Sequence, residues 1–111
     1  MNAQQDFQLE SPMSLDWRKN QGQFFSDEYV IFLLRNSYSF LELAIRYLYR
    51  VTNPYHGRDG KGINRFDYEN FGELFRVIGN RGHLGQDDMN RMRFIVQKYH
   101  KQIQSRVNRK W

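Results

Sequence analysis

The stretch "SDEYVIFLLRNSYSFLELAIRYLYRV", residues 26–51, decides the fold. Ser26 suits a helix N-cap, and Asp27 and Glu28 place negative charge in the first turn, where it complements the helix dipole. One polar stripe then recurs at helical spacing: Glu28, Arg35, Ser39, Glu42, Arg46 and Arg50. Because almost every other position is apolar, the pattern predicts one long central helix, about 39 Å in length if continuous.

A break in this helix is the alternative. Ser39 and Glu42 have the spacing of a capping box, which would start a second helix near residues 36–39. The polar stripe keeps its phase across that point, so we expect the helix to continue.

A glycine-rich loop and two further helices follow. Residues 52–62, "TNPYHGRDGKG", carry loop signals throughout, and Asp67 is the expected N-cap of a short helix over residues 68–78. Asp87 and Asp88 suit the first turn of a final helix. Its apolar stripe contains Met89, Met92, Ile95, Val96, Tyr99, Ile103 and Val107.

No segment alternates with period two, so we predict an all-α fold: a small helical bundle with one long central helix, a Gly-rich loop, a short helix and a basic C-terminal helix. Residues 1–22 are expected to form a mobile N-terminal arm pinned by Leu15 and Trp17. Residues 23–111 would form a single helical domain.

Composition places the protein in a broad class. The 111 residues include no cysteine, and the N-terminus lacks the pattern of a signal peptide. No apolar run approaches the ~20 residues that span a bilayer. We therefore expect a soluble protein, cytoplasmic in a bacterial or phage-infected cell. The net charge of +5 is uneven, because residues 89–111 hold seven bases and no acid.

The glycine loop has three interpretations. A calcium loop with Gly62 at its sixth position would put Gly57, Lys61 and Tyr68 at ligand positions, so the ligand set is incomplete. A nucleotide P-loop needs a preceding strand and a Ser or Thr after the lysine, and both are missing. The favoured interpretation is a shaped corner, with Gly62 at positive φ.

In that corner, Ile63 and Phe66 would enter the core, and Asp59 or Asn64 would bond nearby amides. Backbone amides beside three cations could also form a small anion site. Those candidate phosphate contacts are Arg58, Lys61 and Arg65.

No catalytic or metal site is indicated. The three histidines share no metal-ligand spacing, and the serines have no triad context. Glu69 and Glu73, one helical turn apart, fit a solvated helix face. We expect no enzymatic activity, no cofactor and no metal.

The final helix is the strongest functional lead. Opposite its apolar stripe lie four cations and one ring: Arg91, Phe94, Lys98, Lys101 and Arg109. A cationic face with an exposed aromatic ring suits single-stranded nucleic acid, since charge follows the backbone and the ring stacks on a base. The alternative is a solvated face with Phe94 packed under the acidic N-terminal arm.

The order Asp59-Gly60, Gly62-Ile63-Asn64, Asp67, Phe71-Gly72 and Leu74, followed by Leu84, Tyr99 and Gln102-Ile103, resembles a small helical module. That module occurs in phage and bacterial proteins beside DNA-processing enzymes of the helicase and primase kind. The resemblance spans roughly residues 40–104. It implies a nucleic-acid context and no catalytic residue.

Together these features predict a non-enzymatic helical nucleic-acid-binding accessory protein, encoded by a phage or mobile element, with single strands favoured. The alternative is a protein–protein interaction module, such as a phage-encoded, anti-CRISPR-like inhibitor docking on a bacterial defence nuclease or a replication enzyme. Aromatic residues and arginine also anchor protein interfaces, so composition does not separate the two.

Overall fold

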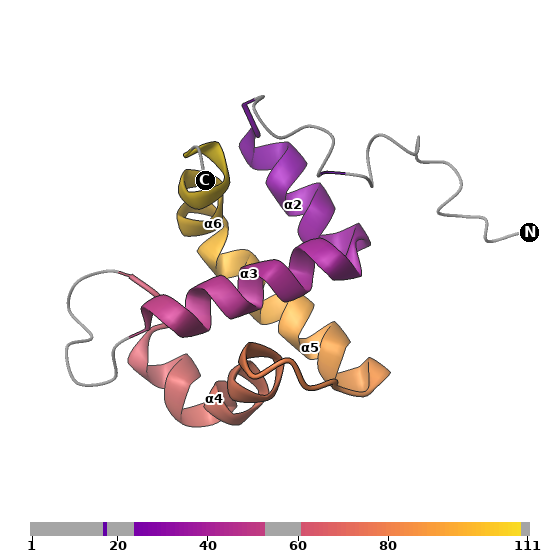
Figure 1. The fold of residues 1–111 in the computed structure, drawn as a ribbon, viewed down its shortest axis with the longest axis vertical. Helices are drawn as coiled ribbons and strands as arrows, with labels where there is room; N and C mark the ends of the chain where they lie inside the picture. The colour runs from indigo at the N-terminus through magenta and orange to yellow at the C-terminus, as the bar shows by residue number, and fades with distance from the viewer. Residues whose placement is uncertain (1–16, 18–23, 53–60, 110–111) are drawn as a thin grey trace, which may run out of the picture.

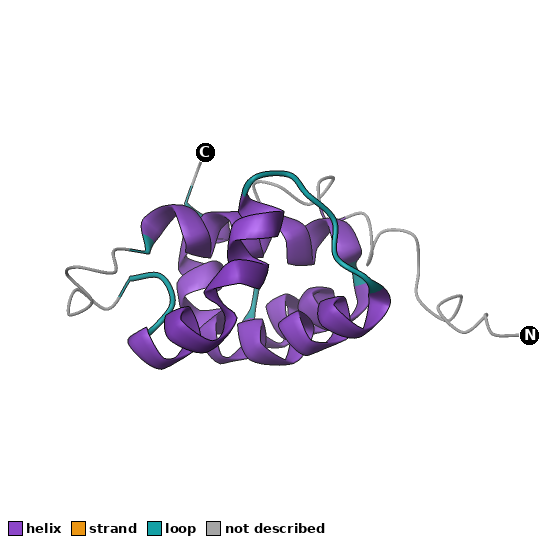
Figure 2. Ribbon diagram, turned by 90° about the horizontal axis from the view of Figure 1, so that it is seen from below, coloured by secondary structure: helices purple, strands orange, loops and turns teal. Residues whose placement is uncertain are grey.

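The computed structural model describes residues 17, 24–52 and 61–109, and its regular elements are all helical (Figures 1 and 2). The elements are α2 (Asp27–Asn36), α3 (Tyr38–Val51), α4 (Arg65–Gly79), α5 (Gln86–Val96), the 3₁₀ turn η3 (Gln97–Tyr99) and α6 (His100–Asn108). The last three follow one another as a single helical run. The predicted all-α class is confirmed, with no strand among the described residues.

The prediction of one long central helix is wrong, because residues 27–51 form two helices separated at Ser37. The Ser37 Oγ accepts a hydrogen bond from the Phe40 N–H at 3.2 Å and caps α3, while Ser37 N–H closes α2 on the Leu33 carbonyl at 2.8 Å. Ser37 rather than Ser39 is the cap. The longest helical run is instead C-terminal, over residues 86–108, and passes behind α3 in Figure 1.

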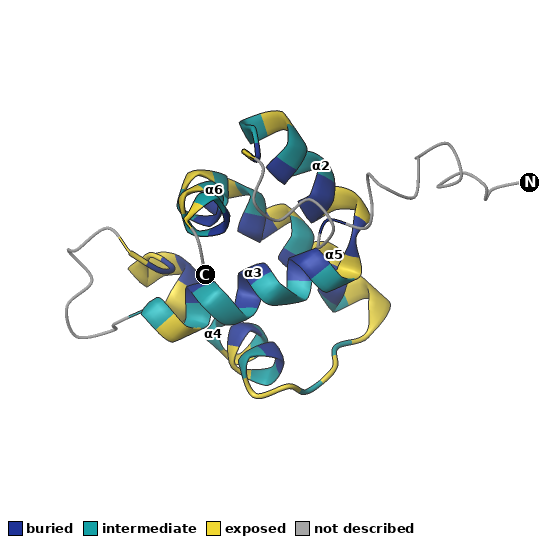
Figure 3. Cartoon of the chain, turned by 45° about the horizontal axis from the view of Figure 1, so that its top comes forward, coloured by how far each residue is buried: buried dark blue, intermediate teal, exposed yellow. Residues whose placement is uncertain are grey.

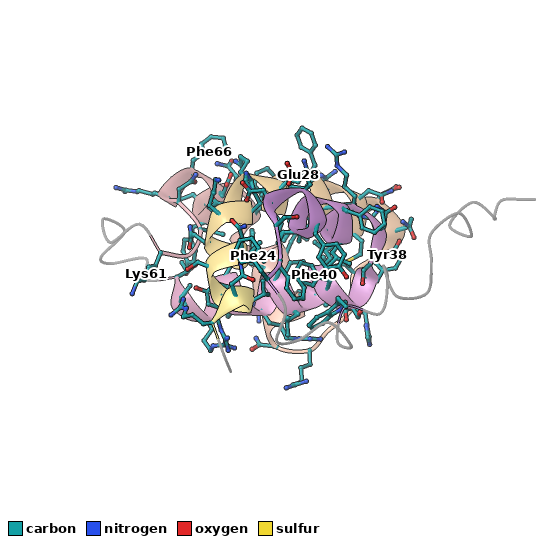
Figure 4. The ribbon with its side chains drawn as sticks, turned by 90° about the horizontal axis from the view of Figure 1, so that it is seen from above. Phe24, Glu28, Tyr38, Phe40, Lys61 and Phe66 are labelled. Atoms are coloured by element: carbon teal, nitrogen blue, oxygen red, sulfur yellow. The ribbon has the colours of Figure 1, made fainter. Side chains whose placement is uncertain are left out.

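The start of α4 also differs from expectation. Asn64, not Asp67, is the N-cap, and its side chain accepts a hydrogen bond from the Asp67 N–H at 2.7 Å. The helix therefore begins at Arg65, and Asp67 lies within its first turn. This phase points Phe66 outward, 65% exposed, so its predicted place in the core is wrong (Figure 4).

One hydrophobic core lies between the helices, as the buried positions in Figure 3 show. The predicted apolar stripe of the last helix is confirmed at all of its positions: Met89, Met92, Ile95, Val96, Tyr99, Ile103 and Val107 are buried. Trp17 also belongs to the core, with its ring edge-on to Phe40 at 5.2 Å. The rest of the predicted N-terminal arm, Leu15 included, lies outside the described residues.

The break at Ser37 yields a stability prediction. Ser37→Ala removes the α3 cap and should lower the free energy of unfolding by about 1–2 kcal/mol. Ser105→Ala, at an exposed position within α6, should change it by less than ~0.5 kcal/mol. Urea unfolding followed by circular dichroism measures both changes. Equal stability of the two variants would contradict the capping role of Ser37.

Candidate nucleic-acid interface

The cations predicted on the last helix are exposed, but three of them already contact carboxylates. Lys101 Nζ lies 2.6 Å from Asp27 Oδ2, and Lys98 Nζ lies 2.8 Å from Asp67 Oδ2. Arg91 pairs with Asp88 one turn earlier at 3.2 Å. Arg109, near the end of the described chain, donates from Nε to the Ser105 carbonyl at 3.4 Å. The predicted basic face is therefore partly neutralised within the chain.

Asp27 joins α2 to α6 through two contacts. Lys101 donates to its Oδ2, and His100 Nδ1 lies 3.2 Å from its Oδ1. The hydrogen bond from Lys101, with a smaller contribution from His100, holds the pKa of the Asp27 carboxyl below its usual value. Since Asp27 remains ionised at neutral pH, Lys101 keeps its partner there.

The glycine corner has the structural role that the sequence favoured. Gly62 has a φ of +77°, and its N–H and carbonyl bond the Gln102 side-chain amide at 2.7 and 3.1 Å. Ile63 is buried as predicted, and Asn64 bonds an amide. Asp59 lies outside the described residues.

Of the predicted phosphate contacts at this corner, the structure describes Lys61 and Arg65. Arg65 Nε pairs with Glu69 at 3.0 Å, Lys61 is exposed, and Arg58 lies outside the described residues. Lys61 and Phe66 lie at one end of the molecule, and Tyr38 lies at the other (Figure 4). Arg93 stacks over the Tyr38 ring at 5.0 Å, whereas Lys98 and Tyr99, about one turn beyond Phe94, contact Asp67 at the corner.

Asp67 lies under this corner and is fully buried. Its Oδ2 accepts a hydrogen bond from the Tyr99 hydroxyl at 2.5 Å and forms an ion pair with Lys98. Burial, followed by the hydrogen bond to Asp67, raises the pKa of the Tyr99 hydroxyl above its usual range, so it remains a donor at neutral pH. Lys98 is therefore exposed to solvent and also neutralises a carboxylate that is fully buried.

Phe94 is 79% exposed, so it does not pack under any described part of the chain. Its ring borders a shallow depression, open to solvent, lined by Arg35, Asn90, Arg93, Phe94 and Gln97. Arg35 comes from α2 and the other residues from α5 and η3. None of the lining residues is acidic, and neither arginine forms an ion pair with a described carboxylate.

Sequence reasoning identified Phe94 but missed its neighbours. Arg35 belonged to the polar stripe of a presumed single helix, and nothing in the sequence brings it beside Phe94. The sequence gives only a weak indication of Arg93, which adjoins Phe94 in a segment without acidic residues. Asn90 and Gln97 lie one turn before and almost one turn after Phe94, a helical spacing that places them on its side of the helix.

No family model, no curated protein sequence and no solved structure matches this chain. The resemblance to a helicase- and primase-associated module therefore stays a prediction. Among the described residues, the helices lack the combined length and apolar character that crossing a membrane requires. The same residues bring together no group of three potential metal ligands.

Proposed function

We propose that this protein is a non-enzymatic nucleic-acid-binding accessory protein that engages single strands at the Phe94 depression. The observation that carries the proposal is a phenyl ring 79% exposed beside two arginines that lack carboxylate partners among the described residues. Base–aromatic stacking contributes about 1–3 kcal/mol per base, and cations along the groove follow the backbone.

Arg35 and Arg93 replace part of the basic face expected from sequence. A paired surface lysine must exchange its carboxylate for a phosphate, whereas Arg35 donates only from Nε to Gln97 Oε1, at 3.0 Å. Its terminal nitrogens therefore face no acceptor among the described residues. Lys101 and Arg91 remain secondary contacts, because exposed ion pairs contribute little and exchange readily.

Two substitutions separate stacking from charge in oligonucleotide binding. Phe94→Ala should cost ~1–3 kcal/mol of binding free energy for single strands and leave the salt dependence nearly unchanged. Arg35→Gln should reduce the slope of log K against log salt by about 0.7. Fluorescence anisotropy over a salt series measures both effects.

Phe66→Ala is the matched control, because it removes another exposed phenyl ring (65%) that does not line the depression. It should leave affinity unchanged. Equal losses of affinity in Phe94→Ala and Phe66→Ala would contradict binding at the depression. If no oligonucleotide binds at low salt, the proposed nucleic-acid-binding function is wrong.

A second candidate function is a protein-docking module. It is favoured by the ion pairs that carboxylates form with Lys98, Lys101 and Arg91. A partly neutralised helix with exposed aromatic rings suits a protein surface, such as a phage-encoded inhibitor meeting a bacterial defence nuclease or a replication enzyme. In that case Phe94→Ala would mainly accelerate dissociation of the partner.

A further inference from the structure

Hydrogen bonds around Phe94 already engage both side-chain amide oxygens of the depression. Asn90 Oδ1 accepts from Gln86 Nε2 at 3.1 Å and from Arg93 at 3.4 Å. These two bonds occupy both lone pairs of that oxygen. Gln97 Oε1 accepts from Arg35 Nε at 3.0 Å.

The polar groups left over are mainly donors. Asn90 Nδ2, Gln97 Nε2 and the terminal nitrogens of Arg35 have no acceptor among the described residues. A ligand of this depression must therefore supply acceptors, because a donor placed against these N–H groups would leave both groups unpaired.

From this pattern we infer that the depression selects keto bases, uracil, thymine and guanine, over the amino bases cytosine and adenine. The inference rests on the proposed single-strand binding and adds a base preference to it. At pyrimidine C4 or purine C6, keto bases present the O4 or O6 acceptor, whereas cytosine and adenine present an exocyclic amino donor there. The base would stack on Phe94, with its keto edge toward the amides of Asn90 and Gln97 and its phosphate toward Arg35.

Oligodeoxyuridylate and oligodeoxycytidylate of equal length give the cleanest comparison. Both are pyrimidines without a methyl group, so the exchange of a keto for an amino edge is not confused with strong base stacking or a methyl contact. At low salt we expect uridylate to bind the full chain roughly fivefold or more tightly, the lower end of one base-edge contact.

Asn90→Asp tests the amide directly, because it replaces the Nδ2 donor with an acceptor of the same shape. The ratio of uridylate to cytidylate affinity should fall to about one or below. Asn70→Asp adds the same charge on the exposed face of α4. It should weaken both ligands equally and preserve the ratio.

The outcomes separate the inference from the proposed function. Equal binding of the two oligonucleotides, still dependent on Phe94, would overturn the base preference and leave single-strand binding intact. An unchanged ratio in Asn90→Asp, with the helical circular dichroism spectrum preserved, would overturn the role given to Asn90. Failure of both oligonucleotides to bind would overturn the preference and the proposed function together.

Discussion

Gly62→Ala should lower the free energy of unfolding by about 3–5 kcal/mol, the sum of backbone strain and overpacking. Gly62 has a φ of +77°, a conformation that L side chains rarely adopt. An added Cβ would lie 2.3 Å from Thr52 Oγ1 and 2.5 Å from Thr52 Cα. The Thr52 side chain cannot easily move, because its hydroxyl accepts from Ile63 N–H and donates to the Leu48 carbonyl.

Gly72→Ala is the matched control for this prediction. Gly72 lies inside α4, and its added Cβ would meet nothing closer than the Tyr68 ring at 3.7 Å. A glycine inside a helix costs roughly 0.5–1 kcal/mol relative to alanine, so this variant should be more stable than the parent. Thermal and urea unfolding measure both. A Gly62→Ala protein within ~1 kcal/mol of the parent would show that the corner relaxes.

The position of Gly62 could be predicted because its signal is local. A glycine at the end of a loop-forming run and ahead of a helical pattern indicates a turn that favours positive φ. The stripe from Met89 to Val107 was predictable for the same reason, since its period lies within one segment. Its burial is confirmed throughout.

The break at Ser37 was harder to predict, because its determinants are distant in sequence. Ser37 Oγ bonds Ser39 Oγ at 3.2 Å, which in turn accepts from the Trp17 indole N–H at 3.1 Å. A cap contributes only about 1 kcal/mol, so tertiary contacts decide whether the helix stops. The polar stripe is compatible with either outcome.

Only part of the candidate site could be predicted, because some of its contacts join residues that are distant in sequence. Exposure of Phe94 follows from its place opposite the apolar stripe. The pairing of Lys101 with Asp27 joins residues 74 positions apart, and the contact of Arg35 with Gln97 spans 62 positions. Sequence shows which cations exist, whereas only the fold shows which of them meet a carboxylate.

Asp67→Ala should be the second strongly destabilising substitution, lowering the free energy of unfolding by roughly 3 kcal/mol. Asp67 is fully buried, and its carboxylate links α4 to the C-terminal run through Tyr99 and Lys98. Its loss leaves the Tyr99 hydroxyl buried without its acceptor. The Lys98 side chain is 54% exposed and turns to water, which keeps the loss near the lower end for a broken buried pair.

Asp88→Ala provides the matched control, since Asp88 also lies in the first turn of a helix and pairs with a cation, Arg91. That pair is on the surface, so its removal should cost less than ~1 kcal/mol. Tyr99→Phe and the double variant with Asp67→Ala complete a thermodynamic cycle in urea. The coupling should reach at least ~1 kcal/mol, because the two groups share one buried hydrogen bond. Additive losses would show that Asp67 acts through Lys98 or through its charge in the first turn of α4 rather than through Tyr99.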